Sequence, residues 1–225
     1  MSPLNRRDLL ASLGGTAAVA ILNRPVRAAA PVEGQDYARI DPPQPTGDPA
    51  RVMVTEFFSY MCPHCASFAP TFAAWTKRQP ADVQVERAAI SLGHTPWVPA
   101  ARTYPVLVSM NAVGKVEDAL WAAIHQQGVQ LYTEAAFTDW MGKHGVDAKS
   151  FADQYKSFAI DMQLRTAESR ARANQVGSTP TLVVDGRYRV EIGDIGPGRE
   201  AHYRTQLAAV DQLIALARQQ HKAKG

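Results

Sequence analysis

The sequence predicts an α/β fold in which a helical block interrupts a chain of strands and helices. Three observations lead to this expectation. A strand–helix–strand pattern occupies residues 51–85, a β-hairpin followed by a long helix begins at residue 181, and residues 97–175 between them are helical in pattern. With 225 residues, 46% hydrophobic and 20% charged, the chain can bury a core without staples. We therefore expect one domain elaborated by an insertion.

The first 28 residues have the pattern of an export signal. Arg6 and Arg7 precede an apolar run over residues 9–22, and small residues follow it. This run is short of the roughly 20 residues needed to span a bilayer, so we expect cleavage after Ala28 and a soluble mature protein in the periplasm. The paired arginines resemble a twin-arginine signal, although Sec signals also contain such pairs.

The charge balance argues against nucleic acid as a partner. Removal of the signal takes away four of the 24 basic residues and one of the 21 acidic residues, so the net charge falls from +3 to near zero. No basic stripe remains in the mature chain. We expect no nucleic-acid binding.

The strands and helix before the helical block form one unit. Residues 37–40 fit a short edge strand, and residues 51–58 are almost continuously apolar, which predicts a central parallel strand buried on both faces. Val83 and Val85 alternate in the next strand and complete a βαβ unit. The helix between these strands has apolar residues at i, i+3, i+7 and i+10, namely Cys65, Phe68, Phe72 and Trp75.

The helical block has one clear apolar face and several break points. Pro105 is expected to kink or restart its first helix. Three glycines are expected at helix C-caps. The glycines are Gly114, Gly128 and Gly145, and the residues expected on one helix face are Phe137, Trp140, Met141 and His144.

A hairpin and a helix end the chain. Residues 181–184 and 187–190 are strand-like, and Asp185-Gly186 between them predicts a type I′ turn. The final helix carries an apolar face of Tyr203, Leu207, Val210 and Ile214.

The only two cysteines stand in the motif Cys62-Pro63-His64-Cys65 at a predicted helix start. The N-terminus of a helix stabilises a thiolate at Cys62, and Cys65, one turn further, can resolve a mixed disulfide. Pro63 suits the first helical turn, and His64 can place a second positive group near the sulfur. Both features favour the thiolate and therefore the reduced dithiol.

Two other roles for the cysteine pair remain open. A structural disulfide across so short a loop would be strained and reducible. A zinc or copper site would need more ligands, and the sequence has no second cysteine pair or His-x-x-x-His spacing. We therefore predict a redox-active disulfide between Cys62 and Cys65, with no metal and no other cofactor.

Two residues outside the motif are also candidates for the site. Pro180, after Thr179, is predicted to be cis and to lie beside Cys62, where the loop could clamp an extended substrate. Glu56 interrupts the buried strand, and an acid buried there without a fixed partner would have a raised pKa and could relay the proton of Cys65. The alternative is that Glu56 pairs with a lysine or reaches solvent at the sheet edge.

Residues 54–65 (Val-Thr-Glu-Phe-Phe-Ser-Tyr-Met-Cys-Pro-His-Cys) resemble the active-site segment of the DsbA family in the thioredoxin superfamily. Residues 33–37 are similar to the start of the mature chain in that family. The resemblance implies a thioredoxin fold with an inserted helical domain. The thioredoxin-like domain would comprise residues 29–98 and 177–225, and the inserted helical domain residues 99–176.

The resemblance also implies roles and partners. Cys62 would attack or be attacked, Cys65 would resolve, His64 would stabilise the thiolate, Glu56 would relay protons, and Pro180 would contact substrate. The substrates would be unfolded exported proteins with cysteine pairs, and a membrane quinone reductase of the DsbB type would reoxidise the dithiol. Thr179 replaces the valine of the best-known member, which bears on the strength of the oxidant.

Several functions are compatible with these residues. The first is a protein disulfide oxidase, which we expect to be monomeric because too few residues precede the first buried strand for a dimerisation domain. A disulfide isomerase or reductase would use the same chemistry. A glutathione-dependent isomerase would not need Cys65, and a periplasmic copper- or zinc-binding chaperone would turn over no protein thiols.

Overall fold

The computed structural model describes residues 30–48, 50–193 and 196–223. The predicted export signal lies outside these residues. Within them, none of the helices is both long and apolar enough to cross a membrane.

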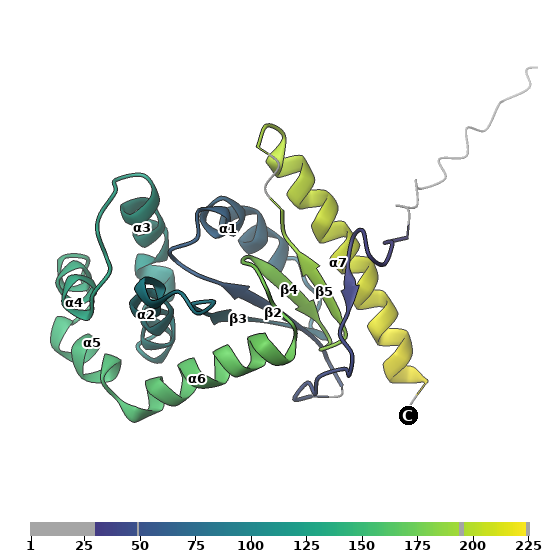
Figure 1. The fold of residues 1–225 in the computed structure, drawn as a ribbon, viewed down its shortest axis with the longest axis horizontal. Helices are drawn as coiled ribbons and strands as arrows, with labels where there is room; N and C mark the ends of the chain where they lie inside the picture. Colours follow the sequence, from purple (N-terminus) through teal and green to yellow (C-terminus); the bar gives the residue numbers. More distant parts are fainter. Residues whose placement is uncertain (1–29, 49, 194–195, 224–225) are drawn as a thin grey trace, which may run out of the picture.

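A five-stranded sheet forms the centre of the molecule, with the strand order β1-β5-β4-β2-β3 (Figure 1). Strand β2 runs parallel to β3, and the other neighbouring strands are antiparallel. Every residue of β2 except Met53 is buried, which confirms the predicted strand with two covered faces. The strands are β1 Ala38–Arg39, β2 Val52–Phe58, β3 Val83–Ala89, β4 Thr181–Val184 and β5 Tyr188–Glu191.

Helices cover both faces of this sheet. The amphipathic helices α1 and α7 pack together on one face, and their apolar side chains share a core with β2, β4 and β5. Helix α6 lies against the other face, where Ala171 packs with Phe57 and Ile90. The helices are α1 Pro63–Thr76, α2 Val98–Ser109, α3 Val113–His125, α4 Glu134–Lys143, α5 Ala148–Tyr155, α6 Phe158–Ala173 and α7 Arg199–Lys222, with a 3-10 turn at Thr95–Trp97.

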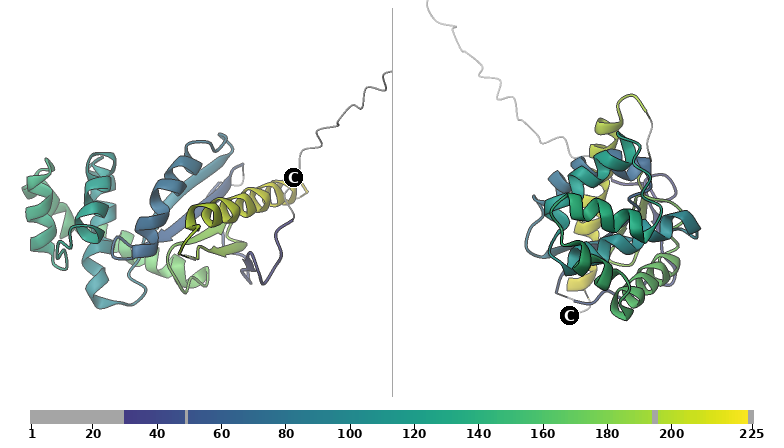
Figure 2. Two further views of the ribbon diagram at one scale, coloured as in Figure 1. Left: turned by 90° about the horizontal axis from the view of Figure 1, so that it is seen from above. Right: turned by 90° about the vertical axis from the view of Figure 1, so that its left-hand side faces the viewer.

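Helices α2 to α5 form a separate layer beyond the end of the sheet, and α6 leads back from this layer to the sheet (Figures 1 and 2). The layer has its own apolar core, which extends to the start of α1 and includes both cysteines. Major members of this core are Phe58, Tyr60, Leu107, Leu120, Phe137, Met141 and Phe151.

The structure corrects two expectations about the helical block. Helix α2 does not restart at Pro105 but runs through it, because burial of side chains such as Val106 and Leu107 offsets the lost hydrogen bond. Gly114 lies in the first turn of α3 and Gly128 lies two residues beyond its C-cap, whereas Gly145 directly follows the C-cap of α4 with a positive φ.

His144 lies on the expected face of α4, next to Trp140. It is the exposed C-cap residue, and its ring stacks on Trp140 with a centroid distance of 3.7 Å. Its Nδ1 lies 2.7 Å from the carbonyl oxygen of Trp140. The ring therefore covers Trp140 from outside.

The hairpin between β4 and β5 has the predicted type I′ turn. Asp185 and Gly186 have φ values of 54° and 60°, and Arg187 N–H closes the turn on the carbonyl of Val184. A side chain at residue 186 would collide with the main-chain oxygen of Gln44, so this position requires glycine.

Candidate active site

Cys62 lies at the point where the central strand turns into a helix. Strand β2 ends at Phe58, and Cys62 is the N-cap of α1 with φ −88° and ψ 118°. Pro63 occupies the start of the helix, where its missing N–H costs no hydrogen bond. The first unpaired N–H groups of α1 therefore point toward the sulfur of Cys62.

The surroundings of Cys62 favour its thiolate. Hydrogen bonding from the Cys65 thiol is the largest effect that lowers the pKa of Cys62 from 9.0 to about 5, against the opposing effect of burial. The main-chain N–H groups of Cys65 and His64 lower it further. The His64 side chain itself is exposed. In this geometry, His64 lowers the pKa of Cys62 through its main-chain N–H group.

Cys65 has the opposite environment, although it lies one turn away on the same helix. Its side chain is buried, with 1% of the residue exposed. Burial raises the pKa of Cys65 well above 9.0, and the hydrogen bond to Cys62 and the charges of Cys62 and Glu56 raise it further. In the reduced protein, Cys65 therefore stays protonated, and its thiol donates a hydrogen bond to the thiolate of Cys62.

The loop before β4 faces the dithiol. The Thr179-Pro180 peptide bond is cis, as predicted, and both residues are buried. When Cys62 is a thiol, its Sγ donates a hydrogen bond to the carbonyl oxygen of Thr179 at 3.2 Å. The main chain of this loop thus lies within contact distance of the nucleophile.

Glu56 lies on β2 with only 1% of the residue exposed, and it has a fixed partner, contrary to expectation. Arg87, opposite it on β3, donates from Nε to Glu56 Oε2 at 2.5 Å. Neither alternative, a lysine partner or solvent at the edge, describes this pair. Burial nevertheless raises the pKa of Glu56, while the charge of Arg87 opposes that shift.

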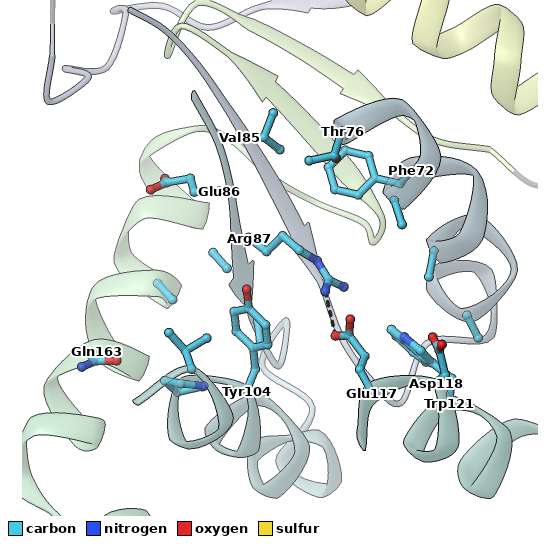
Figure 3. A pocket seen from close by; sticks show the side chains of 18 of the residues that line it. Phe72, Thr76, Val85, Glu86, Arg87, Tyr104, Glu117, Asp118, Trp121 and Gln163 are labelled. Atoms are coloured by element: carbon cyan, nitrogen blue, oxygen red, sulfur yellow. Dashed lines mark hydrogen bonds and ion pairs between the residues drawn. The ribbon is translucent and has the colours of Figure 1, made fainter. Parts of the chain in front are cut away.

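Sequence reasoning missed three members of this charged cluster. Arg87 Nη1 also donates to Glu117 Oε1 at 2.7 Å (Figure 3), and the Tyr60 hydroxyl donates to the same oxygen at 2.7 Å. The guanidinium carbon of Arg87 lies 4.1 Å from the ring centroid of Phe58. Burial lowers the pKa of Arg87, but Glu56 and Glu117 outweigh it and raise the pKa overall. The sequence feature that could have indicated this cluster is Arg87, a charged residue within a predicted strand.

The described residues contain no group of three or more histidine, cysteine, aspartate or glutamate side chains placed to hold a metal ion. The arrangement around Cys62 instead suits thiol–disulfide exchange, because it pairs a stabilised thiolate with a buried thiol at resolving distance.

Comparisons with known proteins agree with this chemistry. The family described as Thioredoxin matches residues 46–194. The thiol:disulfide interchange protein DsbA of Pseudomonas aeruginosa is 36% identical over 82% of this chain and 85% of its own length. The chain belongs to the DsbA family. The DsbA of Burkholderia cepacia is 34% identical over 80% of this chain and 84% of its own length.

Solved structures of DsbA proteins share the fold. The crystal structure of Pseudomonas aeruginosa DsbA has a TM-score of 0.78 and 34% identity, and the match covers 85% of this chain and 97% of that one. DsbA from Xylella fastidiosa has a TM-score of 0.75 and 28% identity, with 84% and 99% covered. The chain therefore has the predicted α/β thioredoxin-type fold, and its enzyme class is thiol:disulfide oxidoreductase. A metal-binding chaperone is not favoured.

Proposed function

We propose that this DsbA-family protein is a periplasmic oxidase that introduces disulfide bonds into exported proteins. The observation that carries the proposal is the low pKa of Cys62, about 5, which stabilises the reduced dithiol at neutral pH. A dithiol that is stable when reduced gives up its disulfide readily, because transfer to a client leaves the protein in its favoured state.

Transfer of the disulfide takes two exchange steps. A client thiolate attacks Sγ of Cys62 in the Cys62–Cys65 disulfide, and the electron pair of the broken bond leaves on Cys65, which takes up a proton. A second client thiolate then attacks the client sulfur of the mixed disulfide, and Cys62 leaves as its stabilised thiolate. The client is oxidised by two electrons and the protein dithiol is reduced by two.

Other residues support these steps. Pro63 fixes the start of the helix, and His64 stabilises the thiolate of Cys62 through its main-chain N–H group. Thr179 and Pro180 contact the client segment next to its cysteine, because the main-chain oxygen of Thr179 lies 3.2 Å from Sγ of Cys62, where an extended peptide would meet this loop. Glu56 relays the proton that Cys65 takes up and releases, because its charge already acts on the Cys65 thiol.

The partners follow from this reaction. The substrates are unfolded exported proteins with cysteine pairs, and a membrane quinone reductase of the DsbB type takes up the two electrons from the reduced dithiol. Export through the signal at residues 1–28, by the twin-arginine or Sec route, would deliver the protein to the periplasm, where it acts as a monomer. Nucleic acid plays no part.

The proposed domain division assigns separate tasks to the two parts of the chain. Residues 29–98 and 177–225 form a thioredoxin-like domain that supplies Cys62, Cys65, Thr179 and Pro180. Residues 99–176 form the inserted helical domain, which buries Cys65 in the core that includes Phe58 and Tyr60.

The reduction potential tests this function against an isomerase or a reductase. The mature protein, residues 29–225, would be equilibrated with glutathione buffers, and its free thiols counted by alkylation and mass. We expect a potential well above about −180 mV, the value of a disulfide isomerase, whereas about −270 mV would indicate a reductase. Full activity of Cys65→Ser would instead favour a glutathione-dependent isomerase.

A further inference from the structure

A large groove runs along the free edge of β3. Its cavity volume is about 1170 Å³, and it lies between α1 and α6, with α2 and α3 closing one end (Figure 3). We call it the β3-edge groove. Its walls include Ala69 and Ala73 of α1, Val85 and Arg87 of β3, and Met162 and Ala167 of α6.

The floor of the groove presents unpaired main-chain groups. Ile90 N–H bonds to Phe58 and the Asp82 carbonyl accepts from Val52, so even-numbered residues of β3 face β2. The N–H and C=O groups of Val85 and Arg87 therefore face the groove, whereas Ala89 is buried against the helical layer. No hydrogen bond within the described part of the chain reaches these groups of Val85 and Arg87. Alternate outward positions of an edge strand form a template for an added strand.

The charges that line the groove are balanced. Three basic and three acidic side chains border it. Arg87 is bound by Glu56 and Glu117, and Arg170 pairs with Glu86. The unpaired members, Lys77 and Asp118, are of opposite sign. Such a groove complements a segment without net charge.

The rim of the groove is apolar where it meets solvent. Val108 on α2 is 51% exposed and Met162 on α6 is 44% exposed, and both line the cavity. Few large apolar residues of the described chain are so exposed. An apolar segment in the groove would cover them.

The groove is continuous with the dithiol through α1. Ala66, which lines the groove, lies four residues after Cys62 on that helix, a rise of about 6 Å. The groove therefore ends about one helical turn from the nucleophile. The described chain begins near β1, at the opposite edge of the sheet from β3.

We propose that the β3-edge groove binds an extended, uncharged segment of a reduced client polypeptide, which adds to β3 as a sixth strand. The proposal rests on the proposed oxidase function, and it places a second contact with the client away from the Thr179-Pro180 loop. Main-chain hydrogen bonds to β3 supply affinity with little sequence preference. This suits an enzyme that acts on many unfolded chains.

Amide hydrogen exchange tests the strand addition directly. The probe is ribonuclease A, reduced and carbamidomethylated at every cysteine so that the blocking group adds no charge, and it is added to the oxidised mature protein. We expect exchange at Val85 and Arg87 to slow by at least about tenfold, since added strands protect amides. Arg39, whose N–H faces outward at the other edge of the sheet, should be unchanged. Unchanged exchange at the two β3 amides would overturn the proposal.

Oxidation rates test whether the groove serves the reaction. Val108→Glu combined with Met162→Glu should slow oxidation of reduced, unfolded ribonuclease A by about tenfold, because carboxylates would be buried against an apolar segment. Oxidation of dithiothreitol should not change. The matched control combines Val98→Glu and Phe158→Glu, which are exposed positions on the same two helices outside the groove. It should match the wild type on both substrates.

The outcomes separate the groove from the oxidase function. Equal rates for the groove variant and the control on unfolded ribonuclease would overturn the groove and leave the oxidase intact. A wild-type protein that oxidises neither substrate would refute the oxidase, and amide exchange with the carbamidomethylated probe would still decide the groove. Protection of the β3 amides that follows protein concentration without any probe would assign the groove to a second copy and overturn the proposal.

Discussion

The two ends of the first turn of α1 give their cysteines opposite environments. At the N-terminus, Cys62 meets hydrogen-bond donors and the cis Thr179-Pro180 loop. One turn later, Cys65 lies near the ion pair of Glu56 and Arg87. The pKa of the first thiol is lowered to about 5, and the pKa of the second is raised.

This difference shows how one helix can supply both a thiolate leaving group, Cys62, and a thiol that stays protonated, Cys65. Donors from the helix start stabilise negative charge without a full desolvation cost, because they replace the hydrogen bonds of water. Burial and a nearby carboxylate have the opposite effect on Cys65. The charge on Glu56 is tolerated only because Arg87 neutralises it and is itself held by Glu117. Three predictions test this contrast. They concern the ion pair of Glu56 and Arg87, the thiolate of Cys62 and the proton of Cys65.

The largest expected effect concerns the buried ion pair of Glu56 and Arg87. Arg87→Met should lower the free energy of unfolding by about 4 kcal/mol, because it leaves Glu56 buried without a cation. Urea denaturation of the oxidised protein would measure the loss. Burial should then raise the pKa of Glu56 further, so the destabilisation should shrink as the pH falls and the carboxyl takes up a proton.

A second arginine provides the control for this prediction. Arg102 binds Asp161 at 3.0 Å in the helical layer, but Asp161 is partly exposed and also binds Arg165. Arg102→Met should therefore cost only about 1 kcal/mol. Equal losses of unfolding free energy in the two variants would show that the Glu56–Arg87 pair stabilises the protein no more than the Arg102–Asp161 pair does.

The parts of this contrast that are local in sequence could be predicted, and the parts that depend on register could not. Pro63 marks a helix start, and Asp185-Gly186 specifies its turn, because each residue type restricts its own backbone. The pairing of Glu56 with Arg87 depends on the register of two strands about 30 residues apart, which apolar alternation alone does not determine. A single sequence does not indicate which strands and helices come together, so it could not place Glu117 there.

The helical layer shows the same limit from the other side. Pro105 is a strong local signal for a helix restart, yet α2 continues because tertiary packing outweighs local preference. His144 follows the helical period of the buried residues of α4 and stacks on Trp140, but it lies at the C-cap and is exposed. Periodicity predicts which residues share a face, and the helix end decides which of them stay exposed.

The next effect in size concerns Cys62 and pH. Its pKa is about 5 in the folded reduced protein and 9.0 in the unfolded chain, so the folded form is stabilised as pH rises from 5 and loses this stabilisation as pH falls to 5. At pH 7 the gain is about 2.7 kcal/mol, or about 60 mV toward a more oxidising potential. The oxidised protein has no thiols and should lack this dependence.

Thermal or urea unfolding of both redox forms between pH 5 and 8 would measure the difference. The stability of the reduced form relative to the oxidised form should rise by about 1.4 kcal/mol per pH unit. Reduced Cys62→Ser should show no such slope. A slope that persists in this variant would mean that another group, and not the thiolate at the helix start, carries the pH dependence.

The smallest effect distinguishes a proton relay from simple charge repulsion at Cys65. Glu56→Gln removes a charge that raises the pKa of Cys65, so electrostatics alone predicts that Cys65 ionises more easily and resolves a Cys62 mixed disulfide faster. A relay predicts the reverse, a rate about tenfold slower, because the carboxylate no longer accepts the proton. Glu117→Gln removes a charge from the same cluster and should leave the rate within about twofold, which rapid mixing with acid quench and mass detection would resolve. A faster or unchanged rate in Glu56→Gln would reduce Glu56 to a buried structural partner of Arg87, and the contrast between the two cysteines would then rest on their mutual hydrogen bond, burial and the helix start.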